Sequence, residues 1–190
     1  MTDRHEPAPG ADLVVPEGTG LVTLAAARVH RAVNAAPYRR IPSLYADPAA
    51  WAVLEAVDEL WAGRPDEPRE PETTATILVS TYGTLDTVAG IARAVPGGRL
   101  SALRFAGAGA GAPVSLVCMV HGLRGPSLTL TTDPARGLPA ALTTARHWLR
   151  TGAAGHVVVA VHEHDPLHGH DVRCVVVGAA PALRPSGAPR

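Results

Sequence analysis

One segment of the chain carries four side chains that could bind a metal or transfer protons. These are four histidines within nine residues: His162, His164, His168 and His170. On an extended strand, His162 and His164 would project to the same face, because side chains alternate between the two faces. Together with His168 or His170 they could supply nitrogen ligands for zinc or nickel. The spacing matches no established motif such as HExxH, so a polar connection between two strands is the alternative. We therefore predict no metal and no other cofactor, and keep these four histidines as the candidate ligands.

A few side chains could act as acids or bases if the protein is an enzyme. His162 and His164 are two of these candidates, and His121 and Asp133 are the others. Ser80 follows an apolar run, as active-site serines often do, but no GxSxG motif surrounds it. A serine hydrolase is therefore not expected.

The composition describes one globular domain. The chain has 190 residues, of which 46% are apolar, and its formal net charge is zero, so nothing indicates nucleic-acid binding. No apolar run is long enough to cross a bilayer, and Met1 to Gly10 does not resemble a secretory signal. We expect a cytoplasmic protein that does not contact the membrane. Cys118 and Cys174 lie in apolar runs and are expected to be buried free thiols.

The elements that must position these side chains alternate between helices and strands. The apolar pattern predicts helices at 48–63, 85–95, 114–121 and 138–151, and strands at 77–81, 127–132, 156–161 and 172–177. The apolar run 21–27 fits either a strand or the start of a helix. The alternation implies an α/β fold with right-handed crossovers and a largely parallel sheet, whose last two strands are antiparallel neighbours.

The expected organisation is a disordered N-terminus at 1–11, one domain at 12–180, and a loose C-terminal tail at 181–190. The proline-rich composition of the tail and the polar start of the chain support these limits.

The segment from Gly122 to Thr132 reads GLRGPSLTLTT and resembles the segment that precedes the nucleophile in β-ketoacyl synthases. Gly137-Leu138 stands where that family opens its next helix, and the run 77–87 is similar to an earlier strand and glycine turn of the family. The resemblance implies the N-terminal half of a thiolase fold, an α/β structure with a mostly parallel mixed sheet packed with helices.

Two departures from the family bear on activity. Family enzymes read T-A-C-x-x-G at the nucleophile, whereas this chain reads TDPARG from Thr132 to Gly137, which puts Pro134 at the cysteine position. Proline cannot form an acyl-enzyme intermediate. In addition, the family's HGTGT and NxFGFGG motifs, which supply catalytic histidines and belong to its C-terminal half, are missing. The resemblance therefore implies a ketosynthase-like protein that does not condense acyl groups.

The segment from Thr132 to Gly137, which departs from the family pattern, has two interpretations. Asp133-Pro134 is a good helix start, with a capping side chain and a proline in the first turn. Alternatively, Thr132, Asp133 and Arg136 point into the former acyl pocket as recognition groups.

The resemblance also implies a dimer, because the corresponding strand of thiolase-fold proteins pairs across a two-fold axis. The residues of that dimer strand are Ser127, Leu128, Thr129, Leu130, Thr131 and Thr132. The partner would be a second copy or a full-length ketosynthase, and an acyl carrier protein is a further possible partner. The resulting hypothesis is a non-catalytic accessory protein, like a chain length factor, in polyketide or fatty-acid-type biosynthesis. The alternative is a small enzyme that isomerises, dehydrates or transfers a carrier-bound acyl chain.

Overall fold

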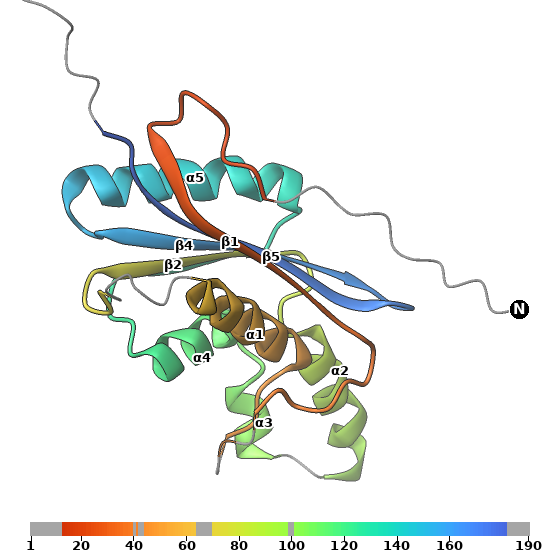
Figure 1. Ribbon diagram of the computed structural model, residues 1–190. Helices are drawn as coiled ribbons and strands as arrows, with labels where there is room; N and C mark the ends of the chain where they lie inside the picture. The colour runs from red at the N-terminus through yellow and green to blue at the C-terminus, as the bar shows by residue number, and fades with distance from the viewer. Residues whose placement is uncertain (1–12, 40, 42–43, 64–69, 99–100, 182–190) are drawn as a thin grey trace, which may run out of the picture.

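A five-stranded sheet forms the centre of the protein (Figure 1). The computed structural model describes residues 13–39, 41, 44–63, 70–98 and 101–181. The strands are β1 (Leu21–Arg31), β2 (Thr74–Ser80), β3 (Ser127–Leu130), β4 (His156–Asp165) and β5 (Gly169–Ala179). Their spatial order is β1-β5-β4-β2-β3. β2 is parallel to β3 and β4, whereas β5 is antiparallel to both β4 and β1.

The helices cover both faces of this sheet. They are α1 (Pro48–Ala62), α2 (Leu85–Ala94), α3 (Ala102–Ala106), α4 (Ala112–His121) and α5 (Pro134–Thr151), with a 3₁₀ turn at Val95–Gly97. α1 and α4 pack on one face with the side chains of Leu78, Ala160 and Cys174. α5 packs on the other face, against Ile77, Val159 and Val175. Figure 1 shows α5 on the opposite side of the sheet from α1, α2 and α4.

α1 begins where the sequence predicts. The Asp47 side chain accepts a hydrogen bond from the N–H of Ala49, and Pro48 occupies the first turn, where its missing N–H is not needed. Trp51 and Trp61 are both buried, so the helix presents its apolar face to the sheet along its length. The second oxygen of Asp47 accepts from the N–H and hydroxyl of Thr87, which joins α1 to α2.

α5 begins in the same manner, with Asp133 accepting from the N–H of Ala135 and Pro134 in the first turn. At Gly137, a Cβ atom would lie 2.4 Å from Cγ1 of Val79, so only glycine lets α5 approach β2 this closely. Gly152 ends the helix in the left-handed conformation, directly after the predicted last residue 151.

The α/β class and the mixed sheet are confirmed. Parallel pairing is confined to β2 and its two neighbours, so the sheet is less parallel than the alternation of elements suggests. The ambiguous run 21–27 belongs to a strand, β1. The last two strands are longer than predicted, because β4 continues to Asp165 and β5 begins at Gly169, which leaves only residues 166–168 as the connection.

The predicted dimer strand is shorter than expected, since β3 ends at Leu130 and Thr131 and Thr132 lie in the connection to α5. Residues 1–11 and most of the predicted tail, 182–190, lie outside the described residues, so the predictions made for them stay predictions. In the part of the chain that the structure describes, none of the helices has the length and apolar character that a bilayer crossing requires.

Candidate functional site

The candidate site lies where the parallel strands β2 and β4 end. Ser80 and His162 are paired neighbours at the last position of β2 and late in β4. The β4–β5 hairpin continues beyond this point and pairs His164 with His170. Because side chains alternate along a strand, His162 and His164 project to the same face, as the sequence predicts. That face is the one covered by α1.

Hydrogen bonds connect the interior of the protein to this end of the sheet. Oγ of Ser80 lies 2.8 Å from Nδ1 of His162, and it also accepts a hydrogen bond from the N–H of Gly83. Nε2 of His162 lies 3.0 Å from Nδ1 of His170. Nε2 of His170 in turn lies 3.6 Å from a carboxylate oxygen of Asp86, at the start of α2. The four side chains form one polar row, which we call the Ser80–Asp86 row.

The two inner histidines of this row are neutral at pH 7. Burial, together with the imidazoles of His170 and His164, lowers the pKa of His162 to about 3. Burial and the neighbouring His164 lower the pKa of His170 to about 4, against the opposite effect of the Asp86 charge. Each imidazole therefore has one protonated and one unprotonated nitrogen, so each can donate and accept a hydrogen bond.

Tyr82 covers the outer part of the row. Its ring stacks on His164 with the centroids 3.9 Å apart, and its hydroxyl donates to Asp86 at 2.8 Å. Burial, followed by the hydrogen bond to the Asp86 carboxylate, raises the pKa of Tyr82, so the phenol stays protonated. The hydroxyl therefore holds one carboxylate oxygen of Asp86, while the aromatic ring lies against His164.

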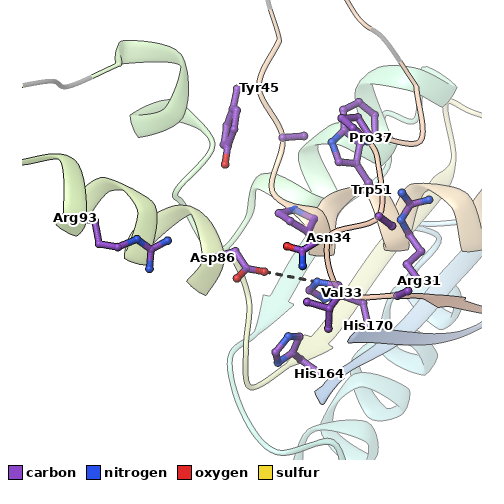
Figure 2. A pocket seen from close by; sticks show the side chains of 14 residues that line it. Arg31, Val33, Asn34, Pro37, Tyr45, Trp51, Asp86, Arg93, His164 and His170 are labelled. Carbon is purple, nitrogen blue, oxygen red and sulfur yellow. Dashed lines mark ion pairs between the residues drawn. The ribbon is translucent and has the colours of Figure 1, made fainter. Parts of the chain in front are cut away.

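A pocket of about 330 Å³ opens at the end of the row. Figure 2 shows His164, His170 and Asp86 on one side of it, with Arg31 and Arg93 farther apart along the wall. Arg31 is paired with Glu55, so its charge is balanced. The pocket thus brings imidazole, carboxylate and guanidinium groups to one concave surface, which suits a polar ligand.

Only part of the set of candidate metal ligands meets here. Among the described residues, ligand atoms of Asp86, His164 and His170 lie within 4.8 Å of one another. His168 does not join them: it lies in the hairpin turn, 3.0 Å from Asp165, with its side chain 61% exposed. His162 contacts His170 but turns its other nitrogen to Ser80.

The remaining candidates lie elsewhere. His121, at the end of α4, is 3.2 Å from a carboxylate oxygen of Asp58 on α1. Asp133 and Arg136 are exposed at the start of α5, on the sheet face opposite to the histidines. Thr132 is half-buried beside them, and Pro134 is the first residue of the helix. The structure therefore separates Pro134, the position that the resemblance gives to the nucleophile, from the histidine site.

Sequence reasoning missed Asp86 and Tyr82 as partners of the histidines. Both follow β2 and are far from the β4–β5 hairpin in sequence, although Tyr82 comes directly after a predicted buried strand. Polar residues that follow such strands often line sites, and this was the one available signal.

No protein-family model matches the sequence, and no curated protein is significantly similar to it. Solved structures are similar in fold. The ishigamide ketosynthase/chain length factor superposes with a TM-score of 0.68 at 19% identity, covering 87% of this chain and 63% of that chain. A ketosynthase in complex with its chain length factor from Xenorhabdus doucetiae gives a TM-score of 0.62 at 12% identity. That likeness covers 87% of this chain and 81% of the other chain.

A third similar structure is a type II polyketide acyl carrier protein in complex with its ketosynthase, with a TM-score of 0.63 at 10% identity. That likeness covers 84% of this chain and 62% of the other. The chain thus spans less than two thirds of the first of these structures. The described part of the protein has the fold of ketosynthases and chain length factors.

Proposed function

We propose that this protein is a non-catalytic partner of a ketosynthase in polyketide or fatty-acid-type biosynthesis, in the manner of a chain length factor. The observation that carries the proposal is the start of α5, where Pro134 takes the position that the resemblance gives to the nucleophilic cysteine. A proline ring offers no thiol or hydroxyl for acyl transfer. The likeness to ketosynthase and chain length factor structures supports the same interpretation.

The chain's two cysteines do not provide a substitute nucleophile. Cys174 is fully buried on β5 beneath α1, with its thiol 3.3 Å from the carbonyl oxygen of Ala56. Burial raises the pKa of Cys174 to about 12 and also raises the pKa of Cys118. Because the thiolate is the reactive form, neither residue is activated for acylation.

The free edge of β3 supports a role in assembly. β3 is the last strand of the sheet, and no other strand among the described residues pairs with its outer side. An edge strand with unpaired N–H and C=O groups is a template for pairing with another chain. Leu128 and Leu130 are partly buried against the α5 core, so the strand is held in place for such pairing.

The test is the solution mass of the full chain, alone and mixed with a cysteine-bearing ketosynthase from the same organism. We expect analytical ultracentrifugation to show a stoichiometric complex with the ketosynthase. Intact-protein mass spectrometry should show no acylation of this chain by a carrier-bound acyl group. A chain that stays separate from every such ketosynthase, or that becomes acylated itself, would contradict the proposal.

A second candidate is a small enzyme acting on a carrier-bound acyl chain, and the Ser80–Asp86 row is the observation that favours it. His164 and His170 line the pocket and are the groups placed to move a proton there. His162 would act as a positioning residue, since it is fully buried. Turnover of a carrier-bound acyl substrate that is lost in His164→Ala but kept in His168→Ala would establish this function.

A further inference from the structure

We propose that Asp86, His164 and His170 form a binding site for a divalent transition-metal ion, with Zn²⁺ as the expected occupant. Two imidazole nitrogens and one carboxylate oxygen are a ligand set that zinc takes at sites with an open fourth position. The three ligand atoms lie within 4.8 Å of one another. The inference does not depend on the proposed partnership with a ketosynthase.

One of the three ligand-to-ligand distances is already close to that around a bound ion. Ligand atoms around tetrahedral zinc, each 2.0–2.1 Å from the metal, lie roughly 3.3 Å apart. The pair formed by His170 Nε2 and Asp86 is already 3.6 Å apart. His164 has to approach the other two, and it is only half-buried at the pocket wall, so its ring can move without disturbing the core.

Outer contacts orient two of the three ligands. One carboxylate oxygen of Asp86 accepts from the Tyr82 hydroxyl, which leaves the other oxygen beside His170. Nδ1 of His170 is hydrogen-bonded to His162, which leaves its Nε2 beside Asp86. Metal-bound histidines in proteins almost always have their second nitrogen hydrogen-bonded in this way, and ligating carboxylates are hydrogen-bonded too.

The elements around the cluster make it rigid on one side. His164 and His170 are directly opposite each other on β4 and β5, and Gly169 directly precedes His170 at a φ of 107°. A Cβ atom at Gly169 would lie 2.1 Å from the carbonyl oxygen of Arg31, so the hairpin meets β1 without space for a side chain. The two imidazoles are thus carried by paired strands and not by a loop, which favours a defined geometry.

The open side of the cluster faces the pocket (Figure 2). One divalent ion with two neutral imidazoles and one carboxylate leaves a net positive charge at this wall. A water molecule or an anionic oxygen from the pocket would complete the coordination.

The experiment titrates the metal-free, tag-free full chain with Zn²⁺ alone and measures binding by isothermal titration calorimetry. We expect one ion per chain. In Asp86→Ala and in His164→Ala, the affinity should fall by at least the roughly 10–100-fold that loss of an outer contact costs, since each variant removes a ligand. Co²⁺ added in place of Zn²⁺ should give the visible absorption of a low-coordinate site. This absorption should be absent in both variants. Both residues are partly exposed, so these variants are expected to fold, and circular dichroism checks this.

His168→Ala is the matched control, because it removes a histidine from the same hairpin that is not among the ligands. Its affinity should stay within about twofold of the unaltered chain, as expected for an exposed site with no role in binding. Tyr82→Phe should weaken binding by roughly 10-fold, since it removes an outer contact and keeps all three ligands. The proposal is overturned if the unaltered chain binds no stoichiometric Zn²⁺, or if His168→Ala loses as much affinity as His164→Ala.

Discussion

His162 Nε2 and His170 Nδ1 lie 3.0 Å apart on neighbouring strands, and this contact joins the interior of the protein to its pocket. On the inner side, His162 is held by Ser80, whose oxygen also accepts from the Gly83 N–H in the turn after β2. On the outer side, His170 faces Asp86. On its inner side, the orientation of the pocket histidine His170 is therefore determined by the fully buried side chains of His162 and Ser80.

Replacement of His162 by alanine should destabilise the fold strongly. The side chain is fully buried, and its loss leaves a cavity and two polar neighbours, Ser80 and His170, without their partner. We expect a loss of about 3 kcal/mol in the free energy of unfolding, measured by urea denaturation. The exposed His168→Ala variant should change it by less than about 0.5 kcal/mol. Equal stability of the two variants would show that the row contributes nothing to folding.

Asp47→Ala should also be costly, although the residue takes no part in the site. It removes the cap of α1 and leaves the N–H groups of Ala49 and Thr87 without an acceptor in a buried position. The free energy of unfolding should fall by about 2–3 kcal/mol, compared with about 1 kcal/mol for removal of a typical exposed cap. Asp133→Ala is the matched comparison, because Asp133 caps α5 in the same way but is exposed. Thermal unfolding of the two variants should therefore rank them in that order.

The two thiols should react at different rates. Cys174 is fully buried with a pKa of about 12, so at pH 8 only on the order of one molecule in 10⁴ carries its thiolate. Cys118 is only half-buried, and burial raises its pKa too. A chromogenic disulfide reagent should therefore label the native chain at Cys118 first, with Cys174 labelled only after denaturation. The labelling rate of Cys118 should rise as the pH increases toward the pKa of its thiol. If both cysteines of the native chain were labelled equally fast, the burial of Cys174 on β5 would be contradicted.

Much of the fold could be predicted because its signals are local. Asp47-Pro48 and Asp133-Pro134 mark helix starts through contacts within two residues, and the structure has both caps. The glycine at 152 likewise ends its helix. By contrast, Leu13 to Val15 is apolar like a strand, yet it does not join the sheet, and Leu13 is buried against the α5 core. Apolar character predicted its burial and not its hydrogen bonding.

The site could be predicted only in part, because its members come from distant segments. Alternation along a strand placed His162 and His164 on one face, but the polar sequence after His162 concealed how far β4 continues. Polar residues extend a strand here because they pair across a tight hairpin, which periodicity does not reveal. Asp86 reaches the histidines only through the packing of α2 at the end of the sheet, and no sequence spacing encodes that contact.

β3 has a free outer edge among the described strands, and its register shows which backbone groups point toward that edge. The N–H of Thr76 donates to the carbonyl of Pro126, and the parallel register pairs Leu78 with Thr129. In such a ladder the backbone groups of alternate residues face the same neighbour, so those of Leu128 face β2 and those of Thr129 face away from it. A proline at 129 would therefore remove an outward N–H without breaking a bond inside the sheet.

Thr129→Pro should leave the fold intact and weaken assembly, whether the partner is a second copy or a ketosynthase. We expect at least a roughly 10-fold rise in the dissociation constant, equal to the loss of about 1.4 kcal/mol, measured by sedimentation at several concentrations. Thr129→Val keeps the N–H and the side-chain volume, so it should assemble like the unaltered chain. If Thr129→Pro folds and assembles with unchanged affinity, the partner does not pair along β3. The contact surface would then have to include other elements, and the resemblance to the dimer strand of thiolase-fold proteins would not extend to assembly.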